Sequence, residues 1–357
     1  MTQLNNLVRI YTILRGLLIL SSFVLISFTP SYAQVSHTAV PFLLMTPDAR
    51  GKSMADGGSV YSTGAASVFY NPANLMSVEK YTGDLNYTRP FPDLADDLFA
   101  VNLYAAAGIG DQIRCAIGMN RLDFGSQERV GEYGESLGEY NSYDLAVGLY
   151  GALDLDSTTH IGVGVKYIRS HLSDNAADKS FAFDFGMLFK NRFPGLTYIT
   201  DEYAYPEIRK AVNARDTRGI SIGISLANLG PALSYIDADQ KDPLPRVMRL
   251  GIGYQAVDKA NLGIRTTFDA TKLLIDMDDG FKTELDEIVL SYGIETTIYY
   301  FLTLRGGRFF DVVGDQRMWS IGGGLGVEGL RIDFSYTFDR EDGRSGKDGA
   351  YAISLVL

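Results

Sequence analysis

Apolar residues alternate with small or polar residues at every second position along most of the chain. In residues 181–189 the odd-numbered positions are phenylalanine or methionine, whereas Ala182, Asp184 and Gly186 stand between them. Residues 330–338 follow the same rule. Successive side chains of a β-strand point to opposite faces of the sheet. Each segment therefore predicts a strand with one large apolar face and one small or polar face.

Segments of this kind recur through the chain and share a length close to the 9–11 residues with which a tilted strand crosses a bilayer. Fourteen of them are predicted, at about 81–89, 97–107, 112–121, 141–151, 159–170, 180–190, 218–228, 246–256, 260–269, 287–297, 299–308, 317–327, 329–339 and 349–357. Single-chain bacterial barrels have an even number of strands. We therefore predict an all-β fold, a transmembrane antiparallel β-barrel of about 14 strands. A soluble β-sandwich is the alternative, but it would expose the Phe- and Tyr-rich face to water.

The connections between these segments alternate in length, as expected when short turns lie in the periplasm and longer loops lie outside. The outer loops are predicted at 122–140, 171–179, 229–245, 270–286, 309–316 and 340–348. Loop 122–140 combines four glutamates with Tyr133 and Tyr140, a mixture that suits partner recognition or a simply solvated acidic loop. Connection 191–217 is long where a short one is expected, and its residues 205–213 predict a short helix after a proline.

The first residues have the pattern of a secretory signal peptide. Arg9 and Arg15 precede an apolar run at residues 16–28, and Ser31-Tyr32-Ala33 is a small-x-small site before Gln34. The apolar run is shorter than the roughly 20 residues of a spanning helix, although a single-pass anchor is the alternative. We predict a signal peptide at 1–33, cleaved between Ala33 and Gln34, with the barrel at 81–357.

Charge and composition exclude several classes of function. The formal net charge is −11. The only charged residues of the predicted leader are arginines, so its removal makes the net charge more negative. A negative net charge is unfavourable for binding nucleic acid. Cys115 is the single cysteine, so no internal disulfide forms, and three histidines with one cysteine predict no zinc site. No cofactor is expected.

Three short motifs resemble catalytic or binding signatures but lie in the wrong context. Ser221 is the centre of a G-x-S-x-G sequence, yet it lies inside an alternating strand instead of a strand-turn-helix. Residues 324–329 read G-x-G-x-x-G, but a strand follows where a dinucleotide site needs a helix. Residues 276–280 lack the spacing of a calcium loop. The chain is not predicted to be an enzyme.

Charged residues also occur inside several predicted strands. Their positions in the alternation predict that they face the lumen, where they would bond a plug and occlude the pore; they are Arg265, Glu295, Arg305, Arg331 and Asp333.

Two motifs carry a family resemblance. The first is the Phe69-Tyr-Asn-Pro-Ala-Asn-Leu75 sequence, which contains Asn71, Pro72, Ala73 and Asn74. The second joins Asn228, Leu229 and Gly230 to Pro243, Leu244 and Pro245. Together they resemble the PorV/PorQ family of outer-membrane proteins within the FadL-like barrels. The resemblance implies that residues 34–80 form an N-terminal plug segment in the lumen.

The resemblance further implies a role in type IX secretion at the bacterial outer membrane. Members of the PorV branch bind the C-terminal sorting domain of cargo and carry it from the translocon to the attachment complex. The implied partners are a type IX translocon subunit, cargo sorting domains, attachment-complex proteins and outer-membrane lipid, with no nucleic acid. A FadL-like transporter of hydrophobic solutes such as fatty acids is the alternative, and an outer-membrane hydrolase would need activity that depends on Ser221.

Overall fold

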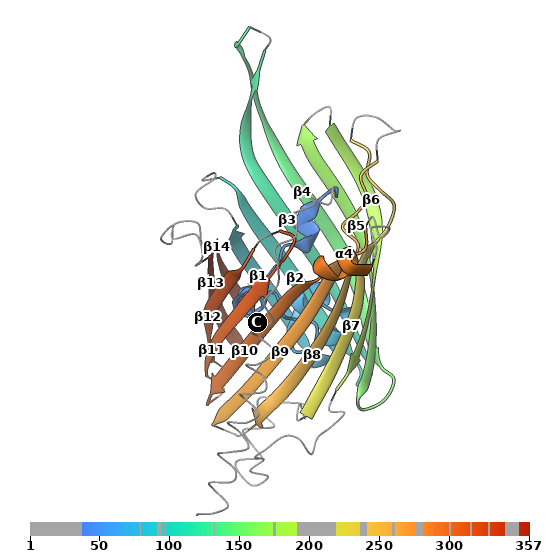
Figure 1. The fold of residues 1–357 in the computed structure, drawn as a ribbon, viewed down its shortest axis with the longest axis vertical. Coiled ribbons are helices and arrows are strands. Elements are labelled where there is room, and N and C mark those ends of the chain that lie inside the picture. Colours follow the sequence, from blue (N-terminus) through green and yellow to red (C-terminus); the bar gives the residue numbers. More distant parts are fainter. Residues whose placement is uncertain are drawn as a thin grey trace, which may run out of the picture. The chain divides into compact units, whose positions relative to one another are not determined.

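The computed structural model describes residues 38–357 except for 79, 91–94, 96, 132, 174–175, 191–218, 236–240, 259–260, 276–280, 300, 315, 328 and 340–349. Fourteen antiparallel strands in this part of the chain form one closed barrel (Figure 1). Each strand pairs with its neighbours in sequence, and β1 closes the ring by pairing with β14. The predicted fold class is thereby confirmed, and the two-sheet sandwich is wrong.

The strands agree with the predicted segments to within a few residues, apart from two hairpins described below. They are β1 (Tyr81–Arg89), β2 (Phe99–Ile109), β3 (Ile113–Val130), β4 (Ser136–Asp154), β5 (Thr159–Ser173), β6 (Ala176–Phe189), β7 (Gly219–Leu229), β8 (Val247–Asp258), β9 (Leu262–Leu273), β10 (Val289–Ile298), β11 (Leu302–Phe310), β12 (Met318–Val327), β13 (Leu330–Asp339) and β14 (Ala350–Val356). No helix within the described ranges is long and apolar enough to cross a membrane.

The alternation of residue types corresponds to two faces of the wall. On β6 the side chains of Phe181, Phe183 and Phe185 point outward and are about half exposed, whereas Ser180 and Asp184 are buried on the lumenal side. Exposed aromatic and aliphatic side chains are stable where lipid replaces water, and closure of the ring satisfies the strand hydrogen bonds in that setting. The outer apolar surface is therefore a membrane-facing band.

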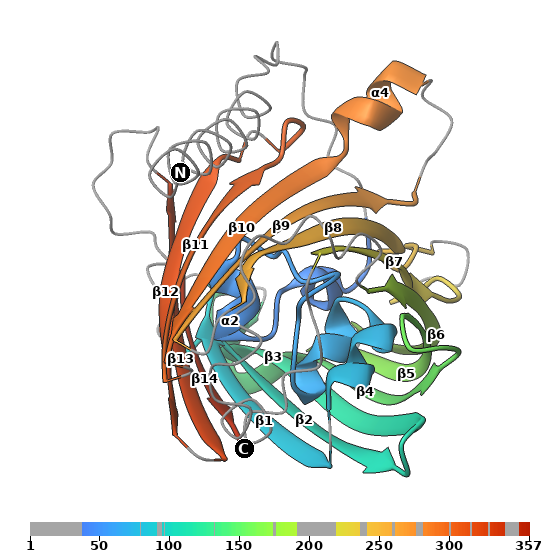
Figure 2. The same cartoon turned by 90° about the horizontal axis from the view of Figure 1, so that it is seen from below.

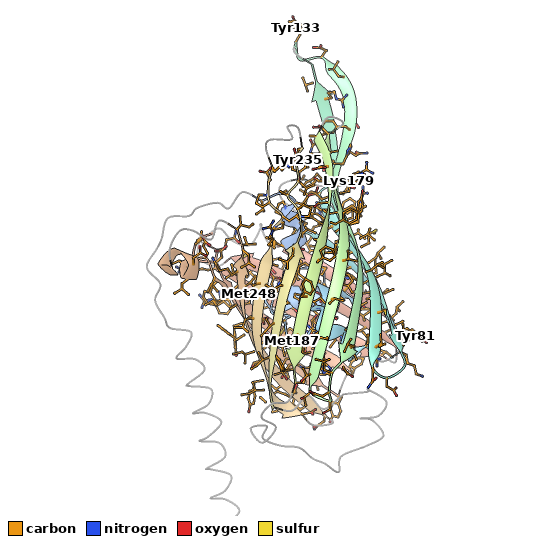
Figure 3. All side chains as sticks on the ribbon, turned by 90° about the vertical axis from the view of Figure 1, so that its right-hand side faces the viewer. Tyr81, Tyr133, Lys179, Met187, Tyr235 and Met248 are labelled. Carbon is orange, nitrogen blue, oxygen red and sulfur yellow. The ribbon has the colours of Figure 1, made fainter. Side chains whose placement is uncertain are left out.

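The β3–β4 hairpin is the largest departure from the predicted strand boundaries. Residues 122–140 were expected to be a loop, but β3 and β4 continue as paired strands up to Val130 and Ser136. This hairpin rises well beyond the rest of the barrel, with Tyr133 at its tip (Figures 1 and 3). The expectation of a loop at 171–179 was also wrong, because β5 and β6 pair as far as Ser173 and Ala176.

The remaining connections are described in part. Short turns join β2 to β3, β4 to β5 and β10 to β11 at the end of the barrel where β14 finishes. We call this the periplasmic end and the opposite end the outer end, following the usual arrangement of such barrels. Within 270–286 the structure contains α4 (Phe281–Asp286). The predicted leader, connection 191–217 with its helix, motif 276–280 and loop 340–348 lie wholly or almost wholly outside the described residues.

Residues 38–78, which we call the lumenal segment, lie inside the ring of strands (Figure 2). The segment contains η2 (Pro41–Leu44), α2 (Ala49–Ser53), η3 (Ala65–Phe69) and η4 (Pro72–Ser77). Its contacts reach strands all around the barrel: the amide of Ala49 donates to Ser354 Oγ at 2.7 Å, and Ser225 Oγ donates to the carbonyl of Tyr70 at 2.7 Å. The segment begins near the outer end, where the Ala39 amide bonds the Pro243 carbonyl at 3.0 Å, and descends to the start of β1.

Candidate functional site

Glycines flatten the lumenal wall where the Asn-Pro-Ala-Asn motif lies. Gly162 of β5 and Gly186 of β6 are directly paired across the two strands. A Cβ atom at Gly186 would lie 2.0 Å from Oδ1 of Asn71, and one at Gly162 would lie 2.3 Å from the carbonyl carbon of Pro72. A side chain at either position would therefore force the segment away from the wall.

The same close approach continues around the barrel. A Cβ atom at Gly223 of β7 would lie 2.2 Å from the carbonyl oxygen of Ser59, and one at Gly307 of β11 would lie 2.6 Å from the carbonyl carbon of Met54. The high glycine content of the chain thus has a packing reason at these strands, because the wall and the lumenal segment meet backbone against backbone. We call Gly162, Gly186, Gly223 and Gly307 the glycine bed.

Asn71 is the best-connected residue of the motif. Its Nδ2 donates to the carbonyls of Ser59 at 3.2 Å and Met187 at 3.0 Å, and its Oδ1 accepts from the Ala73 amide at 3.0 Å. The last bond caps η4, whose first residue is Pro72. Asn74 donates through Nδ2 to the Gly58 carbonyl at 3.0 Å. The motif therefore folds the segment on itself and anchors it to β6.

A buried ionic network ties the segment to the opposite part of the wall. Arg50 of α2 contacts Glu295 of β10 at 3.0 Å, and the same carboxylate contacts Arg265 at 3.1 Å and Arg305 at 2.6 Å. Asp333 of β13 extends the network to Arg305 at 2.6 Å and to Arg331 at 2.8 Å. The prediction that these strand residues face the lumen is confirmed, and Arg50 is their link to the segment.

A second group of buried polar residues lies within the segment. Tyr70 Oη donates to Asp48 Oδ1 at 2.7 Å, and Asp48 also caps α2 by accepting from the Gly51 amide at 3.1 Å. Burial, with the neighbouring Asp48 carboxylate, raises the pKa of Tyr70 well above its ordinary value, so its proton stays in this bond. Burial likewise raises the pKa of the Asp56 carboxyl, against the opposing effect of Lys52.

The second sequence motif lies at the outer end of the barrel, beside the start of the lumenal segment. Asn228, at the end of β7, has φ of 62°, a left-handed conformation that asparagine tolerates. Its side-chain Oδ1 accepts a hydrogen bond from Lys166 Nζ, and its Nδ2 donates to the Pro245 carbonyl at 2.9 Å. These bonds turn the chain after Leu229 and Gly230 inward over the lumen. There Pro243 bonds the lumenal segment, and Leu244 is fully buried.

The two motifs therefore serve different parts of one assembly. The second motif packs against the start of the segment in an apolar cluster that contains Val40, Phe42, Leu233 and Leu244. Asn71 and its neighbours lie farther along the segment, on the glycine bed. Sequence reasoning identified both motifs but missed Arg50 and the glycine bed. The only sequence signal for the glycine bed was the presence of glycine at lumen-facing strand positions.

The motifs that resemble catalytic signatures lie in regular barrel structure. Ser221 is fully buried within β7, and its neighbours continue the strand on both sides. Gly324 lies in β12, and Gly329 lies in the turn before β13 with φ of 75°. Among the residues that the structure describes, no group of three or more His, Cys, Asp or Glu side chains is placed to hold a metal ion.

The β3–β4 hairpin carries several exposed side chains at the outer end. Among the described residues, β3 pairs with β2 only as far as Asp123, and β4 pairs with β5 only as far as Tyr143. Beyond Asp123, the amide of Ser126 donates to the Asp97 carboxylate at 2.9 Å. The tip holds Tyr133, which is 90% exposed, with exposed Val130 and Leu137 below it. This hairpin therefore presents two strand edges and a tip that combines the exposed ring of Tyr133 with the exposed carboxylate of Glu135.

Comparisons with known proteins identify relatives by sequence and by fold. The family model for type IX secretion system protein PorV matches residues 30–279. The solved structure of a FadL homologue from Pseudomonas aeruginosa has a TM-score of 0.51 and 12% identity, covering 90% of this chain and 99% of that chain. The toluene transporter TodX from Pseudomonas putida has a TM-score of 0.49 and 13% identity, covering 92% and 98%. No curated protein sequence matches the chain. The likeness to the FadL homologue shows a shared barrel fold.

Proposed function

Because this outer-membrane barrel belongs to the PorV family of type IX secretion system proteins, we propose that it is a non-enzymatic docking protein of that machinery. It binds the C-terminal sorting domain of cargo and carries it from the translocon subunit to the attachment complex. The outer end of the barrel is the surface that meets these partners.

The observation that carries this proposal is the β3–β4 hairpin, whose strands extend past their last pairs with β2 and β5. A strand edge whose backbone groups lack a neighbour accepts another strand, which is a common mode of protein recognition. The hairpin adds an aromatic tip at Tyr133, and exposed aromatic residues are frequent anchors in interfaces. A folded partner domain can therefore dock outside the membrane without entering the barrel.

The contents of the lumen favour docking over solute transport. The lumenal segment is anchored by Asn71 on one part of the wall and by Arg50 on another. Among the described residues at the outer end of the lumen, Phe42, Met45 and Leu122 line a cavity of only about 10 Å³. Sites for small ligands are usually about 300–1,000 Å³. A larger cavity of about 400 Å³ lies at the periplasmic end, where Lys80 and Arg331 line it together with Val78, Val356 and Leu357. This mixed lining differs from the mainly apolar lining of a site for a hydrophobic solute.

Shortening the hairpin is expected to remove the partners. Ser126 and Asn141 are directly paired, so replacing residues 127–140 by Asn-Gly closes the strands with a two-residue turn and keeps the barrel intact. Pull-down from gently solubilised outer membranes, followed by mass spectrometry, should recover the translocon subunit and sorting-domain cargo with the wild type. The shortened variant should recover roughly tenfold less, which corresponds to about 1.4 kcal/mol of lost contact.

The matched control changes a connection at the opposite end, with Asp111→Asn and Gln112→Gly in the β2–β3 turn. Full recovery of partners by the shortened variant would contradict a role for the hairpin. Recovery of the wild-type barrel with fatty acid and without secretion proteins would favour the transporter instead.

A further inference from the structure

A row of basic side chains crosses the outer face of the wall near the outer end. Arg121 of β3 pairs with Leu145 of β4, Leu145 with Arg169 of β5, and Arg169 with Lys179 of β6. Directly paired residues on neighbouring strands point to the same face of a sheet. Arg169 and Lys179 are exposed on the membrane-facing side, and Figure 3 shows Lys179 high on the wall, above Met187. We call Arg121, Arg169 and Lys179 the basic row.

Aromatic and aliphatic residues lie immediately below the basic row. The next outward residues toward the periplasm are Tyr167 and Phe181, whose ring centroids are 5.4 Å apart. Below Phe181, the outward positions of β6 are apolar down to Phe189. A membrane barrel has an apolar band about 25 Å tall, and a strand tilted by about 40° crosses it in roughly ten residues at about 3.3 Å per residue. Lys179 therefore lies at the boundary between acyl chains and headgroups of the outer leaflet.

The charges of the row are only partly neutralised by the protein. Arg121 contacts Asp123 at 2.6 Å and lies over the ring of Tyr143. Within the described part of the chain, no carboxylate forms a salt bridge with Arg169 or Lys179. By contrast, Lys272, an outward residue of β9, contacts Glu284 at 2.7 Å and Glu287 at 2.6 Å. An exposed cation pair at a headgroup boundary is complementary to anionic lipid phosphate.

We propose that the basic row binds the phosphates of a phosphorylated glycolipid of the outer leaflet, of the lipid A class, whose acyl chains pack over Tyr167 and Phe181. The row extends across three strand spacings of about 4.8 Å, or roughly 14 Å. This length suits a disaccharide that carries a phosphate at each end, whereas a phospholipid such as phosphatidylglycerol offers a single phosphate. The site lies outside the lumen and below the hairpin, and it is independent of the docking function.

The test compares glycolipid binding by the full-length barrel and its charge variants in detergent micelles. The double variant Arg169→Gln, Lys179→Gln removes both unneutralised charges from an exposed surface. Native mass spectrometry with added diphosphorylated lipid A should show binding roughly 10- to 30-fold weaker than that of the wild type, from about 1 kcal/mol for each basic residue. The charge-preserving variant Arg169→Lys, Lys179→Arg should bind within about threefold of the wild type.

One control variant and two control lipids separate this site from general lipid attraction. Arg308→Gln removes an outward arginine of β11, which lies seven strands from β4 around the ring, and it should leave binding unchanged. Dephosphorylated lipid A and phosphatidylglycerol should each bind the wild type at least roughly tenfold more weakly than the diphosphorylated form.

Three results would overturn the proposal. The first is undiminished binding by the double glutamine variant whose heat-modifiable gel mobility shows a folded barrel. The second is equal binding of phosphorylated and dephosphorylated glycolipid, which would leave only the acyl chains in contact. The third is equal binding of phosphatidylglycerol, which would make the row a general anionic-lipid surface. Loss of glycolipid without loss of secretion partners would support the row and leave the docking function standing.

Discussion

Replacing Glu295 by alanine will destabilise the folded barrel by about 3–5 kcal/mol, the usual cost of removing one partner from a buried ionic network. The carboxylate lies between Arg50, Arg265 and Arg305 at 2.6–3.1 Å. Without it, these three cations repel one another in a largely buried site, where Arg50 and Arg305 have little access to solvent. Unfolding in urea, followed by tryptophan fluorescence in lipid vesicles, measures the loss.

Two further variants test whether the loss of stability comes from the buried charge of Glu295. Glu295→Gln keeps the shape of the side chain but not its charge, and it should fall between the wild type and the alanine variant. Glu128→Ala removes a carboxylate exposed on the hairpin, and it should change stability by less than about 0.5 kcal/mol. If the alanine variant unfolds at the wild-type urea concentration, the network does not stabilise the barrel.

Replacing Gly186 by valine will displace the lumenal segment from the glycine bed. The new Cβ would lie 2.0 Å from Asn71 Oδ1, so the clash and the loss of the Asn71–Met187 bond act together. Overpacking costs about 1–3 kcal/mol, which raises the displaced population roughly 5- to 150-fold at about 1.4 kcal/mol per tenfold. A buried Ser59→Cys probe in a Cys115→Ser background reports displacement as faster maleimide labelling.

Gly151→Val provides the matched control. Gly151 is also a strand glycine, but a Cβ atom there meets nothing within 4 Å. Labelling of the probe should therefore stay at the wild-type rate. Equal labelling of the Gly186→Val and Gly151→Val proteins would show that the segment is not held by the bed.

The wall of the barrel could be predicted from the sequence because burial on it is local and periodic. The alternation alone places Phe181 on the lipid-facing side and Asp184 on the lumenal side, because lipid favours apolar residues and the lumen favours polar ones. The β3–β4 hairpin beyond Asp123 could not be found in this way. Both of its faces meet solvent, so residues such as Glu128 and Glu139 obey no period of two and resemble a loop.

The sequence predicted several of the residues that lie in the lumen, but it did not predict which of them contact one another. Arg305 and Asp333 follow from their places in the strands, and the Asn71 motif follows from the family resemblance. One partner of Glu295, however, is Arg50, which is 245 positions away. Nothing local in the sequence encodes that distance. Gly186 has the same limitation, because its neighbour Asn71 lies on another part of the chain.

The reach of the lumenal segment also constrains how the barrel is built. Ala49 bonds a residue 305 positions later, on the C-terminal strand, and folds with many such non-local contacts form slowly. Once β1 and β14 have joined, every strand is bonded on both sides, and the segment can enter only end-on. We therefore expect the segment to dock on the open sheet before the seam forms. In that order of events, the pairing of β14 with β1 would enclose the segment.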